Sequence, residues 1–344
     1  MNRGMISAAI LMAAGYVNSA QGQVSPATLV VELENVVEYQ MDVSDLSKWG
    51  TNPNVTQGLI AMGKGVGCVG VPVVAYGDIV SVNGAPARGA YVGRAVSVCL
   101  SPSPAPGVFA ISDISANSLR DETYYILQSD GVTPIGTIMV NGLNGSVSPT
   151  PPGPPVGPQN YTIVGGTGAF LGARGQKGNG NSRLSSTTPV RTASIAEDPA
   201  MRRQNGGGHI GALLYVTPMS TPDIVITPNG PAVAHSSDFS LVSASKPAAA
   251  GEILSLVATG LGPARASLNP GQPFPLSPLA VVNSPIEVTV NGESAEVLAA
   301  VGYPGAVDGY QVNFRVPTDA AKGAASIQLT AAWIRGTSVS IAIQ

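Results

Sequence analysis

Few side chains in this sequence have the types and spacing that nucleophilic catalysis requires. The chain has two histidines, His209 and His235. A serine or cysteine nucleophile needs a histidine beside it and a carboxylate that orients the histidine. The sequence contains no G-x-S-x-G motif that would mark such a serine. We therefore expect both histidines to be structural or solvated, and we assign no catalytic residue.

Two adjacent carboxylates, Asp121 and Glu122, could suggest the acid pair of glycoside hydrolysis. They fall in a stretch that we predict to be a strand, where neighbouring side chains point to opposite faces. The two carboxyl groups of a glycosidase must instead flank one bond. We therefore reject this pairing.

A glycine motif, Gly65-Val66-Gly67-Cys68-Val69-Gly70, matches the G-x-G-x-x-G pattern of dinucleotide sites. Such a site needs a strand before the glycines and a helix after them, but Pro72 and strand-like residues follow. Two cysteines and two lone histidines also do not form a recognisable set of metal ligands. We expect no cofactor and no metal.

The chain has two cysteines, Cys68 and Cys99, each in an apolar, strand-like run. In an oxidising compartment we expect them to form a disulfide. On the chain-entropy model, closing a loop of about 30 residues stabilises a fold by roughly 3–4 kcal/mol. The alternative is two separate buried thiols.

The N-terminus has the order of a secretory signal. Arg3 precedes an apolar run from Met5 to Val17, and small residues follow up to Gly22. The run of about thirteen residues is too short to cross a bilayer core, which needs roughly 20; the alternative is a buried N-terminal helix. We predict a signal peptide over 1–22, an extracellular or surface location, and no transmembrane segment after cleavage.

The composition indicates an all-β protein. The chain has 42 glycines, 29 prolines and only 11% charged residues, together with many Val, Thr and Ser, which suit short strands and tight turns. Its net charge of −3 provides no basic surface for nucleic acid. About 320 mature residues exceed one comfortable core, so two domains are expected.

Alternating patterns place the elements that would position any site. In the first domain, 23–218, we predict strands at 28–41, 71–82, 91–100, 122–128, 135–143, 160–164 and 209–216. The Asn83-Gly84 turn predicts a hairpin between the second and third of these. Pro-rich residues 148–158 and Gly-rich residues 178–208 are predicted loop insertions, the latter long and mobile. A linker over 219–240 would then lead to about seven short strands in 241–344, the pattern of an immunoglobulin-like β-sandwich.

Residues 160–175 read Asn-Tyr-Thr-Ile-Val-Gly-Gly-Thr-Gly-Ala-Phe-Leu-Gly-Ala-Arg-Gly. This segment resembles the conserved motif of the dirigent and allene oxide cyclase barrel families. The resemblance implies an eight-stranded antiparallel β-barrel, with Phe170 inward and the glycines in a turn between two strands. It also implies that any ligand is held inside the barrel. The residues that we consider for the cavity or its turn are Tyr124, Tyr161, Phe170 and Arg174, with Arg174 either structural or facing a ligand.

A second resemblance covers the C-terminal region. Residues 249–263, the sequence Val-Thr-Val-Asn-Gly at 288–292 and the sequence Tyr-Gln-Val-Asn-Phe-Arg-Val-Pro at 310–317 carry it. They are similar to an uncharacterised C-terminal, immunoglobulin-like domain of secreted proteins of Solibacter-type acidobacteria. The resemblance implies a spacer, a docking module or an adhesive appendage, without an activity.

Three functions follow from these observations. The first is a secreted, non-enzymatic protein that binds a small apolar or sugar-like ligand, or a component of the cell envelope. The second is a barrel enzyme of the isomerase or cyclase type that acts on a small apolar molecule, which requires a buried acid or histidine beside a cavity. The third is a purely structural protein, which a barrel filled solidly by Val, Ile and Phe would favour.

Overall fold

The computed structural model describes residues 26–40, 73–98, 117–145, 160–179, 188–194, 196–265, 268 and 271–344. The predicted signal peptide and both cysteines, Cys68 and Cys99, lie outside these ranges. The described residues form strands and a single short 3-10 helix, Pro199–Met201, without an α-helix, so the all-β prediction is confirmed. In the same ranges, we find no helix with the length and hydropathy needed to cross a bilayer.

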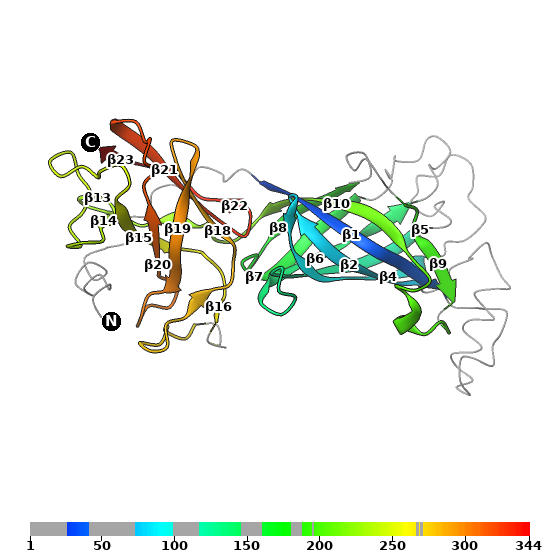
Figure 1. The fold of residues 1–344 in the computed structure, drawn as a ribbon. Coiled ribbons are helices and arrows are strands. Elements are labelled where there is room, and N and C mark those ends of the chain that lie inside the picture. The colour runs from blue at the N-terminus through cyan, green and yellow to red at the C-terminus, as the bar shows by residue number, and fades with distance from the viewer. Residues whose placement is uncertain are drawn as a thin grey trace, which may run out of the picture.

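The first unit is a closed antiparallel barrel of eight strands. The closure arises because β1 pairs with β10 on one side and with β2 on the other (Figure 1). Closing the sheet leaves no unpaired edge, and the predicted barrel is confirmed at this level. Its strands are β1 Ala27–Gln40, β2 Val73–Val82, β4 Arg88–Val98, β5 Asn117–Leu127, β6 Pro134–Gly145, β7 Asn160–Gly168, β8 Arg174–Asn179 and β10 Gly208–Thr217.

A tight turn joins β2 to the short strand β3, Ala85–Pro86, and so leads into β4. Asn83 and Gly84 both have positive φ, 51° and 79°, as a type I′ turn requires. The Asn83 side chain also binds the neighbouring strand, accepting from Val30 N at 2.7 Å and donating to Thr28 O at 3.2 Å. The hairpin that the sequence predicted is therefore present.

The glycine-rich residues 160–175 form strand β7, the turn after it and the start of β8. Gly168 has a φ of 62°, and a Cβ at this position would lie 2.4 Å from the carbonyl oxygen of Ile135, so the turn requires glycine. Phe170 is fully buried inside the barrel. Arg174 donates to the carbonyl oxygens of Val164 at 2.6 Å and Ala173 at 2.9 Å, which gives it a structural role at this turn.

Residues 188–194 and 196–208, predicted to belong to a long mobile loop, instead contact the barrel wall. Strand β9, Arg191–Ser194, pairs in parallel with β1. Arg202 and Arg203 both bind Asp78 of β2, at 2.6 and 2.8 Å. The prediction was wrong here because these ion pairs and the pairing with β1 are long-range contacts that local composition does not reveal.

The second unit is a curled antiparallel sheet around its own apolar core. Residues 219–240, expected to form a linker, contribute to it, because β11 and β14 pair with β15. The strands of this unit are β11 Asp223–Ile224, β12 Ile226–Thr227, β13 Gly230–Pro231, β14 Val233–His235, β15 Ile253–Thr259, β16 Ala264–Arg265, β17 Val281–Val282, β18 Ile286–Val290, β19 Glu293–Gly302, β20 Tyr310–Arg315, β21 Gly323–Ala331, β22 Ile334–Arg335 and β23 Val339–Ile343.

The second unit covers one end of the barrel (Figure 1). Ala332 and Ile334, at the turn between β21 and β22, belong to the apolar core of the barrel and are almost fully buried. Polar contacts surround this plug: Asn283 Nδ2 donates to Pro134 O at 2.9 Å, and Arg265 donates to Thr133 Oγ1 at 3.2 Å. We call this end of the barrel interior the near half and the opposite end the far half.

Candidate functional site

The inward side chains of β5 change from polar to apolar along the barrel axis. Alternate residues of this strand face inward, and from the far half to the near half they are Arg120, Glu122, Tyr124 and Ile126. Ile126 packs in the near half with other apolar side chains, including Ile135. The far half therefore contains charged groups in a position that barrels usually fill with hydrophobic residues.

Two ion pairs occupy the far half. Lys177 Nζ, from β8, lies 2.5 Å from Glu122 Oε2, and the Glu122 side chain is only 1% exposed. Arg120 Nη1 lies 3.2 Å from Glu38 Oε1, of β1, and both of these side chains are 23% exposed. Each buried charge thus has an opposite charge beside it, which burial of ionised groups requires.

Three tyrosines, Tyr91, Tyr124 and Tyr161, line the same cavity as these charges. The Tyr124 hydroxyl donates to Glu122 Oε2 at 3.0 Å, and the Tyr91 and Tyr124 rings lie 5.3 Å apart. The Lys177 ammonium lies 4.9 Å from the centre of the Tyr161 ring, within the range of a cation–π contact. The charges and rings therefore form one connected network.

Burial shifts the pKa values of this network. It lowers the pKa of Lys177, an effect that the nearby Glu122 carboxylate opposes. It raises the pKa of Tyr161 to about 12. The pKa values of Tyr91 and Tyr124 lie well above the usual tyrosine value, first because of burial and then because of the negative charge of Glu122. The tyrosines are therefore neutral hydroxyl groups at physiological pH.

A cavity of about 170 Å³ lies over this network. Its polar wall is formed by the two ion pairs, and its apolar wall includes Val36, Val190 and Ile210. Arg120 has a buried Nε–H without a hydrogen-bond acceptor among the residues that the structure describes. An unpaired buried donor is unfavourable, so this Nε–H is a cost of placing Arg120 in the far half.

The cavity involves two of the four residues proposed from sequence. Tyr124 and Tyr161 line it. Phe170 belongs to the apolar core of the barrel, and Arg174 is exposed at the β7–β8 turn. The structure therefore does not bring Phe170 or Arg174 into the cavity wall.

Asp121 and Glu122 diverge as strand geometry predicted. Asp121 points outward and binds Arg94 at 2.7 Å, whereas Glu122 points into the barrel. Among the described residues, no group of three or more His, Cys, Asp or Glu side chains is placed to hold a metal ion.

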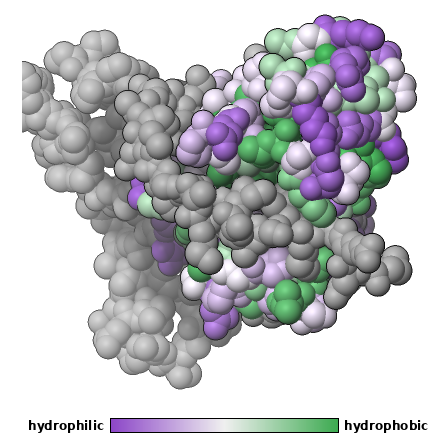
Figure 2. Space-filling view, turned by 90° about the vertical axis from the view of Figure 1, so that its left-hand side faces the viewer, coloured by the Kyte–Doolittle hydropathy of each residue, from purple (hydrophilic) through white to green (hydrophobic). Residues whose placement is uncertain are grey.

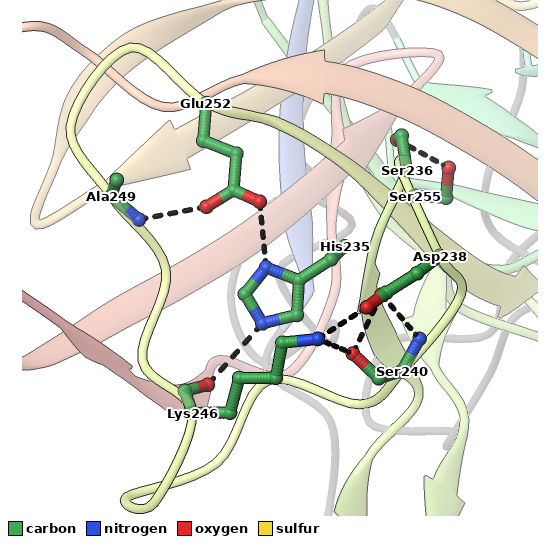
Figure 3. A network of polar contacts seen from close by, with 8 residues as sticks. All are labelled: His235, Ser236, Asp238, Ser240, Lys246, Ala249, Glu252 and Ser255. Carbon is green, nitrogen blue, oxygen red and sulfur yellow. Dashed lines mark hydrogen bonds and ion pairs between the residues drawn. The ribbon is translucent and has the colours of Figure 1, made fainter.

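His235, expected in a linker, lies in β14 with its side chain 5% exposed (Figure 3). Its Nδ1 lies 2.6 Å from Glu252 Oε1, and its Nε2 lies 3.3 Å from the carbonyl oxygen of Lys246. The ammonium of Lys246 in turn binds Asp238 and Ser240. Both ring nitrogens have partners, so this histidine holds the loop after β14 rather than acting as a base.

The other histidine, His209, is at the start of β10. Its Nε2 is buried and has no hydrogen-bond partner within the described ranges, and it is not among the residues that line the cavity. Neither histidine therefore contributes to the candidate site.

Three of the charged residues in the cavity wall were not predicted from the sequence: Glu38, Arg120 and Lys177. Alternation backward from Tyr124 places Glu122 and Arg120 on the same face of β5, which is a signal that was available. Lys177 carried no such signal, because β8 has the sequence Arg-Gly-Gln-Lys-Gly-Asn, whose residue types are poor strand formers.

The described residues on the outer face of the second unit show no continuous apolar patch in the view of Figure 2. Figure 2 shows hydrophobic and hydrophilic residues interspersed on this face.

Comparisons of the chain with models of protein families, with curated proteins and with solved structures found no match. The geometry of the far half of the barrel is therefore the basis for the functional proposal.

Proposed function

We propose that this chain is an exported protein that binds a small molecule inside a dirigent-like barrel, without a chemical change to that molecule. The observation that carries the proposal is the cavity of about 170 Å³ in the far half, with two ion pairs in its wall. A cavity of roughly 150 Å³ can hold a molecule as large as benzene. A barrel with only a structural role would be expected to fill this space with apolar side chains, as the near half does.

The position of the cavity supports the same proposal. The near half is packed with apolar side chains and plugged by the β21–β22 turn, while the cavity lies at the opposite end. The second unit therefore does not cover the end of the barrel that holds the cavity. We propose that the second unit is an immunoglobulin-like module that attaches the barrel to the cell surface or spaces it from the surface.

An enzyme of the isomerase or cyclase type is the second candidate, and one observation favours it. Lys177 and Glu122 share a hydrogen bond in the cavity wall, and burial lowers the pKa of Lys177. A buried acid and base in contact can exchange a proton with a ligand. We place binding first because Lys177 and Tyr124 already engage the Glu122 carboxylate, which would have to release a partner to act as a base.

Narrowing the cavity tests the proposal. Ala212 faces the cavity from β10 and is 2% exposed. We expect the purified protein to bind single-ring compounds, such as cyclohexane derivatives and glucose, in ligand-observed NMR, and Ala212→Leu to abolish the signal. Ala90→Leu, on the outer side of β4, is the matched control and should bind as the wild type does. If no single-ring compound binds to the wild type, the proposed function is wrong.

A further inference from the structure

The walls of the cavity also define the chemical class of the ligand. We infer that the cavity takes a small, neutral molecule with at least two hydroxyl groups, and that it discriminates against charged and purely apolar molecules of the same size. This inference rests on the proposed function, because it requires that the cavity is a binding site.

The first argument is the balance of charge. Glu38 and Arg120 neutralise one another, as do Glu122 and Lys177. A ligand with a net charge would bring an unpaired charge into a space where all four protein charges are already matched. Burial of such a charge is strongly unfavourable, so the balance favours a ligand without net charge.

The ion pairs also leave some N–H donors of the cavity wall without an acceptor in the part of the chain that the structure describes. An ammonium has three donors, and among the described residues Lys177 donates only to Glu122. A purely apolar ligand would displace water from these donors without replacing its hydrogen bonds, which lowers affinity.

The third argument is the pairing of donors with acceptors. In each ion pair an N–H donor lies beside a carboxylate acceptor, and the two pairs belong to the same cavity wall. A hydroxyl group both donates and accepts, so it can bind to both members of a pair. Two such pairs in one wall match a molecule with two or more hydroxyl groups.

The volume indicates the size of the part of the ligand that the cavity holds. A space of about 170 Å³ is close to the roughly 150 Å³ that accommodates one six-membered carbon ring. We therefore expect the cavity to hold about one ring or a short chain of equal size.

Four probes that share one ring separate these properties. They are cyclohexane-1,2-diol, cyclohexane, cyclohexanecarboxylate and cyclohexylamine. With the full chain in saturation-transfer NMR titrations at neutral pH, we expect the diol to bind most tightly. Each charged probe should bind at least about tenfold more weakly, because its charge would be buried without an opposite charge beside it.

A double variant tests which side chains set the preference. Glu122→Leu with Lys177→Met replaces one ion pair by apolar side chains of similar size, a change that proteins often tolerate. Because the Glu38–Arg120 pair remains, this variant should still bind the diol, but its preference for the diol over cyclohexane should be smaller than that of the wild type. The matched control replaces the Arg94–Asp121 pair on the outside of β4 and β5 with Arg94→Met and Asp121→Leu, and it should keep the wild-type order of affinities.

The possible outcomes separate this inference from the proposed function. A wild-type protein that binds cyclohexane, the carboxylate or the amine more tightly than the diol would overturn the inference, while the cavity would remain a binding site. If none of the four probes binds, both the inference and the proposed function fail. The wild-type order decides these points even if the double variant does not fold.

Discussion

The two halves of the barrel interior are built from the same strands but differ in the side chains that fill them. In the near half, Phe170 and Ile126 pack with Ile334 of the second unit into a continuous apolar core. In the far half, the same sheet points Glu122 and Lys177 inward and leaves a cavity. The comparison indicates that the near half provides stability and that the far half gives up packing for a polar site.

The largest effect is expected in the near half. Phe170 is fully buried, and removal of a buried phenyl ring typically costs about 3–5 kcal/mol. We expect Phe170→Ala to lower the free energy of unfolding by about 4 kcal/mol in urea denaturation monitored by circular dichroism. A loss below about 1 kcal/mol would show that the near half is not the stabilising core.

A somewhat smaller loss is expected when one charge of the far half is removed. Lys177→Met leaves the buried Glu122 carboxylate without its ammonium partner, and breaking a buried pair in this way costs about 3 kcal/mol. Addition of Glu122→Leu should recover most of this stability, because no unpaired charge then remains. The same urea denaturation measures both variants. Equal stability of the single and double variants would contradict the pairing.

The tyrosines of the far half should make the protein sensitive to alkali. Burial raises the pKa of Tyr161 to about 12, from an unfolded value near 10. Between these two pH values the unfolded chain binds fewer protons than the folded chain, so stability falls as pH rises. A shift of about two units corresponds to a loss of up to about 3 kcal/mol.

The variant Tyr161→Phe isolates this contribution. As pH rises from about 10 to about 12, the wild type should lose the stability that depends on neutral Tyr161, whereas Tyr161→Phe has no such group to ionise. We therefore expect the unfolding free energy of the variant to rise relative to that of the wild type over this range. Urea denaturation at several pH values, with tyrosinate absorbance as a second signal, provides the measurement. A difference that stays constant with pH would argue against a buried, neutral Tyr161.

The smallest effect is expected outside the barrel. Arg94 and Asp121 form an ion pair with side chains 68% and 52% exposed, and exposed pairs contribute only about 0–1 kcal/mol. We expect Arg94→Met to change stability by less than about 0.5 kcal/mol, against the much larger change for Lys177→Met. Similar effects of the two substitutions would remove the distinction between the inner and outer ion pairs.

Most of the architecture could be predicted from local pattern. The alternation along β1, the Asn83-Gly84 turn and the strands after residue 250 are all local signals, and the structure has the expected barrel and a second antiparallel sheet. The contacts of 188–194 and 196–208 with the barrel wall were not predictable in this way, because Arg202 and Asp78 are far apart in sequence.

The candidate site was predicted only in part, for a physical reason. Tyr124 and Tyr161 follow from the expectation that aromatic side chains point into a barrel. Arg120 and Glu122 have the same spacing along β5, but charged side chains are rarely buried, so their pattern alone does not place them inside. The pairing with Glu38 and Lys177, from strands distant in sequence, offsets the cost of burying them.

The most direct test of the account is a map of where a small molecule binds. Amide chemical shifts of the isotopically labelled protein should be followed during titration with cyclohexane-1,2-diol. We predict that the shifts concentrate in the far half, at Gly178, Gly211 and Ala212, which line the cavity. Shifts that centre instead on Phe170 and Trp333 in the near half, or no shifts at all, would contradict the claim that the far half is the functional site.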